Sequence, residues 1–225
     1  MKINFLGDSI TAGAWLTSPD DKYTVLLCKK LGAIENNYGI SATRIARQTK
    51  PSEDRSFDQD FLSRLDNLDK TADFTFVFGG TNDYGHGDAP LGNIDDETPY
   101  TFYGAMNIMT KYLMESFGRD KLCYILPLPR FDENNRRGGH GCKEKEANTL
   151  EEYREAIREI ALKYGVDLLD LNDLFPVPKA QEADELTADG LHPNARGHKL
   201  LADRLYEYLT KKLNLPANDR VGLKK

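Results

Sequence analysis

Residues 2–13 read Lys-Ile-Asn-Phe-Leu-Gly-Asp-Ser-Ile-Thr-Ala-Gly, an apolar run that stops at a turn. Ile3, Phe5 and Leu6 predict a short buried strand that ends at the following glycine. Open α/β sheets place their chemistry at the carboxyl ends of strands, which is where Ser9 falls. A serine hydroxyl is a weak nucleophile unless a base and an orienting acid lie beside it. Ser9 can therefore act as a nucleophile only if the rest of the chain supplies both partners.

Four more apolar, β-branched runs predict strands, and segments of helical periodicity separate them. The further strands are predicted over residues 33–38, 73–78, 122–126 and 166–169. Helices are predicted over residues 18–31, 57–68, 98–117, 149–164 and 194–213, with a brief helical turn over 44–48. Repeated strand–helix units produce a parallel sheet with helices on both faces. The predicted fold is a single-domain, three-layer α/β/α sandwich with a five-stranded parallel sheet, flavodoxin-like.

Length and composition suit one globular α/β domain. The chain has 225 residues, of which 40% are hydrophobic and 29% are charged. We expect one catalytic domain over residues 1–215 and a frayed tail over residues 216–225. The formal net charge of -6 argues against a nucleic-acid partner, because such binding depends on clustered Lys and Arg.

Cysteine use and hydropathy indicate the compartment. Three cysteines cannot form a fully paired disulfide framework, and Cys28 and Cys123 fall inside apolar segments. No apolar run approaches the ~20 residues that span a bilayer, so no transmembrane segment is predicted. The first strand begins within two residues of the N-terminus, which leaves no room for a signal peptide. A cytoplasmic location is expected, and the sequence does not predict the oligomeric state.

One of the four histidines has a carboxylate at a close, fixed spacing, in the run from Asp189 to Pro193. In a tight turn, Asp189 can reach the Nδ1–H of His192, fix its tautomer and leave Nε2 to face a nucleophile. The same run also fits an Asx-turn at the start of a helix, with a surface histidine. His198 is predicted on the flank of the last helix. His86 could line the mouth of the site or be a plain loop residue, and the sequence does not determine the role of His140.

Three groups could donate to a developing oxyanion. They are the backbone N–H groups of Ser9 and Gly39 and the side-chain amide of Asn82. Each residue could equally be an ordinary turn residue. All three follow predicted strands, so we expect them to converge on one edge of the sheet. Asp8 is expected to support the turn rather than to act as the catalytic acid.

These motifs resemble those of the SGNH hydrolases, also called GDSL-type esterases and lipases, over essentially the whole chain. The matching blocks are Gly7-Asp8-Ser9, Asn37-Tyr38-Gly39-Ile40-Ser41, Gly80-Thr81-Asn82-Asp83 and Asp189-Gly190-Leu191-His192-Pro193. Two residues depart from the family pattern: Ile10 replaces a leucine, and Ala42 stands where many members carry a glycine.

The resemblance implies a role for each matching residue. Ser9 would be the nucleophile and His192 the base, with Asp189 as the acid. Gly39 and Asn82 would complete the oxyanion hole. The implied activity is hydrolysis of carboxylic esters through an acyl-enzyme, with a small-molecule ester of a lipid, an acylated carbohydrate or a simple acyl group as substrate.

Two other functions stay open. An acyltransferase would need the same triad, so the sequence does not separate it from a hydrolase. A flavodoxin-like module could bind a phosphate at residues 7–13, but this loop lacks the P-loop lysine and leaves Asp189 and His192 unexplained. No cofactor or metal is predicted, since His140 and Cys142 have no further ligands nearby in the sequence. Substrate identity and acyl chain length depend on the loops over 84–97 and 127–148.

Overall fold

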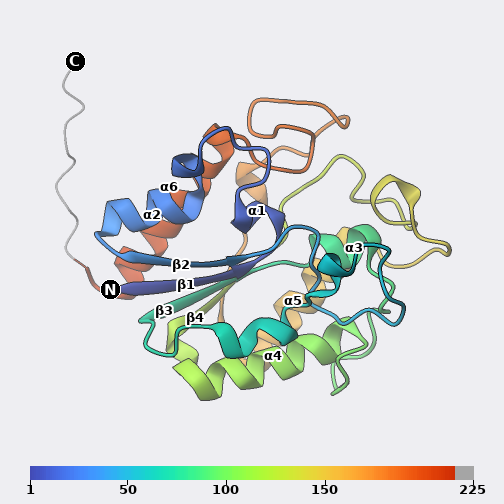
Figure 1. The fold of residues 1–225 in the computed structure, drawn as a ribbon, viewed down its shortest axis with the longest axis horizontal. Helices are drawn as coiled ribbons and strands as arrows, with labels where there is room; N and C mark the ends of the chain where they lie inside the picture. Colours follow the sequence, from blue (N-terminus) through green and yellow to red (C-terminus); the bar gives the residue numbers. More distant parts are fainter. Residues whose placement is uncertain (216–225) are drawn as a thin grey trace.

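The computed structural model describes residues 1–215 and contains a five-stranded sheet in the order β2-β1-β3-β4-β5 (Figure 1). The strands are β1 (Lys2–Gly7), β2 (Ile34–Gly39), β3 (Phe74–Phe78), β4 (Leu122–Ile125) and β5 (Asp167–Leu169). Every neighbouring pair is parallel. This strand order is that of flavodoxin-like folds, and the predicted fold class is confirmed. The frayed tail predicted over 216–225 lies outside the described residues.

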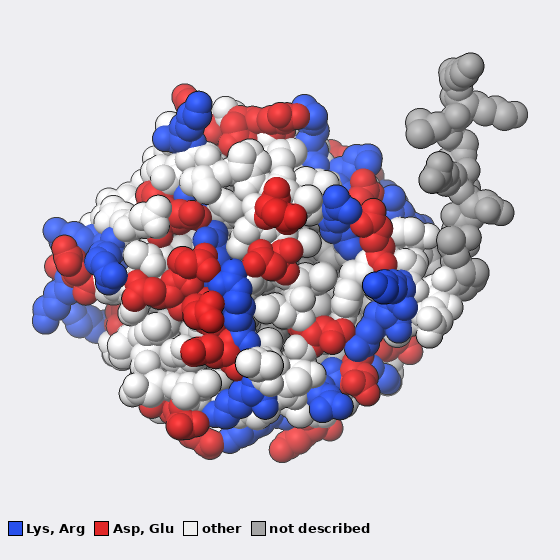
Figure 2. All heavy atoms as spheres, turned by 180° about the vertical axis from the view of Figure 1, so that it is seen from behind, with Lys and Arg blue, Asp and Glu red and all other residues white. Residues whose placement is uncertain are grey.

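Helices cover both faces of the sheet. The pair α2 (Tyr23–Leu31) and α6 (Ala195–Lys212) lies on one face, and α4 (Phe102–Phe117) and α5 (Leu150–Tyr164) lie on the other (Figure 1). No helix within residues 1–215 is both long and apolar enough to cross a membrane. On the face seen in Figure 2, basic side chains lie among acidic ones rather than in a continuous basic stripe.

The first strand supplies side chains to both layers of the core. Ile3 and Phe5 join the cluster under α2 and α6, while Leu6 joins the cluster under α4 and α5. All three are fully buried. Alternate residues of a strand point to opposite faces, and a sheet covered on both sides therefore needs apolar residues in both positions. This requirement explains why Phe5 and Leu6, which are adjacent in the strand, are both apolar.

Local signals in the sequence located the later helices well. Thr149 and Glu152 form a reciprocal capping box at the start of α5, as predicted. Asn194 caps α6 by accepting hydrogen bonds from the N–H groups of Arg196 and Gly197. For α4, the prediction placed the start too early, because Thr101 rather than Thr98 is the capping residue.

Two predictions for the segments beside the sheet edge are wrong, and two short helices there were not predicted. The helix predicted over 57–68 is two 3₁₀ helices, η2 (Arg55–Asp58) and η3 (Leu62–Asn67). The turn predicted over 44–48 is irregular, because the Asp83 carboxylate takes the N–H groups of Ile45 and Ala46. The two helices that were not predicted, α1 (Ser9–Ala12) and α3 (Thr81–His86), begin just after β1 and β3.

His198 does not lie on an exposed flank of α6 but is fully buried. Its Nδ1 accepts a hydrogen bond from the N–H of Tyr23 at 3.1 Å, and the two rings stack with centroids 5.8 Å apart. An accepting Nδ1 requires a neutral ring. Burial, with smaller contributions from His192 and Lys22, lowers the pKa of His198 to about 4. The contact joins α6 to the first residue of α2.

We expect the His198 contact to weaken in acid. The unfolded chain takes up a proton near the ordinary histidine pKa of about 6.5, whereas the folded chain resists it until about pH 4. The contribution of His198 to the free energy of unfolding should therefore be complete above about pH 6.5. It should fall between about pH 6.5 and pH 4, by at most about 1.4 kcal/mol per pH unit. Urea unfolding across this range should show a shallower fall for His198→Asn. The exposed His140→Asn is the control, and parallel curves for wild type and His198→Asn would contradict the prediction.

Candidate active site

The fold brings a serine from the start of the chain beside a histidine and an aspartate from near its end. Ser9 Oγ lies 2.9 Å from His192 Nε2, and His192 Nδ1 lies 2.8 Å from Asp189 Oδ2. Asp189 Oδ1 also accepts the backbone N–H of His192 at 2.7 Å. The candidate nucleophile, base and acid thus form one continuous chain of hydrogen bonds.

The turn that carries Asp189 requires a glycine at position 190. Gly190 has a φ of 76°, and a Cβ there would lie 2.3 Å from the carbonyl oxygen of Ala180, so only glycine fits.

Burial raises the pKa of Asp189, but hydrogen bonds from the His192 ring and backbone outweigh this effect and hold that pKa below its usual value. Asp189 is therefore ionised at neutral pH and stabilises the tautomer in which Nδ1 carries the proton.

Asp8 shapes the turn that carries Ser9. Its Oδ1 accepts the N–H of Ile10 at 3.0 Å and so caps α1. Burial raises the pKa of Asp8 to about 6, although the Ile10 hydrogen bond, His192 and Arg64 oppose this shift. The contacts of Asp8 are those of a residue that supports the turn.

The three candidate oxyanion donors differ in whether their N–H groups already donate to another acceptor. The N–H of Ser9 is at the first position of α1, where a helix supplies no acceptor. Asn82 donates from Nδ2 to the carbonyl of Thr43 at 2.9 Å, which leaves its second N–H for another acceptor. The N–H of Gly39 already donates to Asn37 Oδ1 at 2.9 Å.

Packing by itself explains why position 39 is a glycine. A Cβ on Gly39 would lie 2.3 Å from the backbone nitrogen of Ala12, because the end of β2 runs directly against α1. Gly39 stands where it was predicted, at the carboxyl end of a strand, but its N–H is engaged in this structure.

Arg64 joins the strand ends beneath the site, and nothing in the sequence pointed to it. Its buried guanidinium donates to the carbonyl of Gly7 at 3.2 Å, to the carbonyl of Tyr38, and to Thr43 Oγ1 at 2.9 Å. Burial lowers the pKa of Arg64 to about 10, although Asp8 and Asp60 oppose this shift. The group therefore stays charged at neutral pH and ties β1, β2 and the following loop together.

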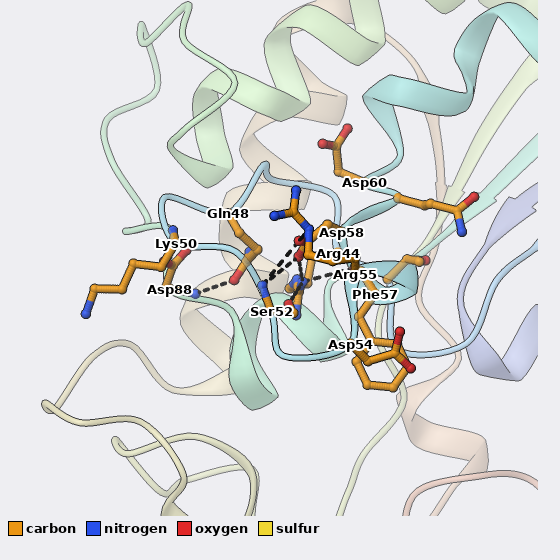
Figure 3. Close-up of polar contacts among 12 residues, drawn as sticks. Arg44, Gln48, Lys50, Ser52, Asp54, Arg55, Phe57, Asp58, Asp60 and Asp88 are labelled. Atoms are coloured by element: carbon orange, nitrogen blue, oxygen red, sulfur yellow. Dashed lines mark hydrogen bonds and ion pairs between the residues drawn. The ribbon is translucent and has the colours of Figure 1, made fainter.

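A cavity of about 640 Å³ lies next to Arg44 and His86. Arg44 lines it and donates to Ser52 Oγ at 3.0 Å and to Asp58 at 3.2 Å, and Figure 3 shows these groups pointing toward one another. Arg44 Nη1 also lies 2.9 Å from His86 Nδ1, and His86 Nε2 lies 3.3 Å from Asn82 Oδ1. The cavity wall therefore contacts one of the candidate oxyanion donors.

The segment around His140 shows no convergence of metal ligands. The His140 ring packs against Phe131, with centroids 5.3 Å apart, while Cys142 Sγ donates to the carbonyl of Gly85 at 3.1 Å. Within residues 1–215, no three His, Cys, Asp or Glu side chains are grouped so that they could hold a metal ion.

Comparison with known proteins identifies relatives of this chain. The model of the GDSL-like Lipase/Acylhydrolase family matches residues 5–200. No curated protein matches the chain significantly.

Solved structures share the fold over almost the whole chain. A protein from Lactobacillus plantarum is 28% identical, with a TM-score of 0.77 over 93% of this chain and 96% of that one. The lipase/acylhydrolase from Enterococcus faecalis is 21% identical, with a TM-score of 0.64 over 96% of this chain and 97% of that one. A member of the lipolytic protein G-D-S-L family from Veillonella parvula is 18% identical, with a TM-score of 0.61 over 94% and 99%.

We expect Arg64→Lys to destabilise the site and the fold together. A single ammonium cannot satisfy the carbonyls of Gly7 and Tyr38 and the Thr43 hydroxyl at once, so buried acceptors lose their donors. The free energy of unfolding should fall by about 2–3 kcal/mol in urea titrations. Arg55→Lys, at an exposed arginine, should change it by less than about 0.5 kcal/mol. Equal unfolding midpoints for Arg64→Lys and wild type would contradict the prediction.

Proposed function

This chain belongs to the GDSL-like Lipase/Acylhydrolase family and is an ester-bond hydrolase, and from that premise we propose that it is a serine esterase with a catalytic triad of Ser9, His192 and Asp189. The observation that carries the proposal is the unbroken path from Ser9 Oγ to His192 at 2.9 Å and from His192 to Asp189 at 2.8 Å. The reaction is hydrolysis of a carboxylic ester through an acyl-enzyme.

In the first half-reaction, Ser9 Oγ attacks the ester carbonyl carbon while His192 Nε2 takes the hydroxyl proton. The C–O bond to the alcohol then breaks, and the imidazolium gives its proton to the departing oxygen. Asp189 holds the ring in position and stabilises the imidazolium. In the second half-reaction His192 deprotonates water, which attacks the acyl-enzyme, and the proton returns to Ser9 as the acid leaves.

The tetrahedral oxyanion receives hydrogen bonds from the N–H of Ser9 and the second N–H of Asn82. Asn82 is supported in this role because Thr43 fixes its amide group without using all of its donors. Gly39 can add a third donor only when Asn37 Oδ1 releases its N–H. We therefore propose Ser9 and Asn82 as the standing donors, with Gly39 dependent on Asn37.

The substrate we propose is a small carboxylic ester: an ester of a lipid, an acylated carbohydrate or a simple acyl compound. Acyl transfer to an alcohol would use the same three residues, and the family match favours water as the acceptor. A phosphate-binding role for the Ser9 turn is disfavoured, because the Ser9 hydroxyl is committed to His192. The catalytic domain over residues 1–215 and the cytoplasmic location stay predictions.

Ser9→Ala should abolish esterase activity without unfolding the protein. Loss of a triad serine removes the nucleophile, and we expect turnover of p-nitrophenyl esters, measured over a series of acyl chain lengths, to fall by at least about 10³-fold. A serine-directed fluorophosphonate should modify Ser9 in the wild type, as read by peptide mass. Ser56→Ala, at an exposed serine, is the matched control. Unchanged activity in Ser9→Ala, or an adduct on another residue, would overturn the assignment.

Asn82→Ala tests the oxyanion donor. We expect kcat to fall by about 10²–10³-fold while KM changes little, because the donor acts mainly on the charge that develops in the transition state. Steady-state kinetics should be paired with urea unfolding, since the variant also loses the bond to Thr43. The exposed Asn67→Ala, outside the loops that flank the site, should behave as wild type in both assays. A kcat within about threefold of wild type would exclude Asn82 from this role.

A further inference from the structure

Trp15, which the triad chemistry does not use, lies against the proposed catalytic base. It is the only tryptophan of the chain, and 65% of its surface is exposed. Its ring centroid lies 6.1 Å from that of His192, with the two planes inclined by 35°. A large indole left in water gains little from burial. Its position beside His192 therefore calls for a functional explanation.

The loop that presents Trp15 is built on the nucleophile itself. The N–H groups of Gly13 and Ala14 donate to the carbonyl oxygen of Ser9 at 3.0 and 2.9 Å, and Leu16 N–H donates to Gly13 at 3.3 Å. These bonds hold the indole in a fixed place relative to the Ser9 hydroxyl. A substrate bound at Ser9 would therefore meet a preorganised ring.

The backbone of Trp15 is strained. Its φ is 68°, in the left-handed region that bulky L-residues rarely adopt. Of the four residues other than glycine with a positive φ within residues 1–215, Ala42 and His140 also lie on loops that follow strands of the sheet. Strain of this kind persists mainly where function retains it. Asparagine or glycine at position 15 would adopt this backbone conformation with less strain. The presence of tryptophan instead indicates that the indole has a function there.

The mechanism decides which half of the ester meets Trp15. When the C–O bond breaks, His192 Nε2 gives its proton to the alcohol oxygen, so that oxygen must lie within hydrogen-bonding distance of the imidazole. The carbonyl oxygen is instead directed to Asn82, whose neighbours are Thr43 and His86. The alcohol half is therefore held beside His192, and the exposed indole of Trp15 has its centroid 6.1 Å from that of the imidazole.

We propose that Trp15 forms the subsite for the alcohol half of the ester and favours alcohols that carry a ring with a flat apolar face, an inference that rests on the esterase function proposed above. The indole presents one flat aromatic face, which suits stacking on a ring. Trp15 is the only large apolar side chain of the loop over residues 13–18 that is mostly exposed, and the other exposed ones within residues 1–215 lie on other segments of the chain. Their positions are Met1, Ile34, Phe57, Ile94, Tyr100, Leu162 and Val177. A single ring matches this surface better than a long alkyl chain. An aryl alcohol and a pyranoside share this chemistry.

Acetate esters test the subsite, because they all form the same acetyl-enzyme and differ only in the alcohol. For Trp15→Asn and Trp15→Gly, which tolerate the backbone conformation, kcat/KM for phenyl acetate or a singly acetylated methyl pyranoside should fall roughly tenfold. For butyl acetate it should change by less than about twofold. Trp15→Tyr should retain most of the ring preference. A loss confined to the aryl ester or to the pyranoside would identify which ring the subsite takes.

The deacylation rate separates ring binding from a positioning effect. Hydrolysis of the acetyl-enzyme uses His192 but no longer involves the alcohol, so its rate constant, measured in pre-steady-state experiments, should be the same in Trp15→Asn and wild type. Leu162→Asn is the matched control. Leu162 is 84% exposed near the end of α5, and β5 begins just after this helix, so Leu162 lies near the amino ends of the parallel strands. An equal loss for all three esters, or a slower deacylation, would overturn the proposal.

Binding can also be followed without turnover. Because Trp15 is the only tryptophan, its fluorescence in Ser9→Ala should change on titration with phenol or with methyl pyranoside, and should stay constant with butanol. Absence of a change with both ring alcohols would contradict the subsite even if Ser9 is confirmed as the nucleophile. If Ser9→Ala instead keeps full esterase activity, the proposed function fails, and this result is distinct from any result at Trp15.

Discussion

The site depends on one buried charge, the guanidinium of Arg64. Where parallel strands run into turns, the regular hydrogen-bond ladder ends, and buried backbone carbonyls there need further donors. Arg64 satisfies the carbonyls of Gly7 and Tyr38 and holds Thr43 in the same fork. Since the Thr43 carbonyl in turn holds the amide of Asn82, one side chain positions both the turn of the proposed nucleophile, Ser9, and the proposed oxyanion donor.

Buried carboxylates complete this network. Asp8 caps the helix that carries Ser9, while Asp83 holds the loop of Ile45 and Ala46 through two backbone N–H groups at 2.9 and 2.8 Å. Burial raises the pKa of each carboxyl to about 6, and hydrogen bonds and nearby cations oppose this shift. The turns after β1, β2 and β3 are therefore connected by polar groups away from water, which is why a catalytic edge built from short irregular segments can be rigid.

Local signals predicted much of the fold. Strand-like runs ending at glycines or turns identified all five strands, although β2 is mostly polar, and the capping box at Thr149 identified the start of α5, because both are decided by neighbours in the chain. The segment over 57–68 was predicted as one helix and is two 3₁₀ helices, since its apolar spacing alone does not distinguish them. The loop after β2 was also mispredicted, because a carboxylate of Asp83, far along the chain, determines its path.

By itself, the sequence determined the α/β/α fold class, the turn that carries Ser9 and the pairing of Asp189 with His192. Each of these depends on short-range spacing and on the types of residue involved. Only the tertiary structure decided that Ser9 and His192 meet at 2.9 Å, that Asn37 occupies the N–H of Gly39, and that Trp15 lies against the imidazole. These contacts join segments whose mutual positions depend on how the two helical layers pack on the sheet, and no pattern within one segment specifies them.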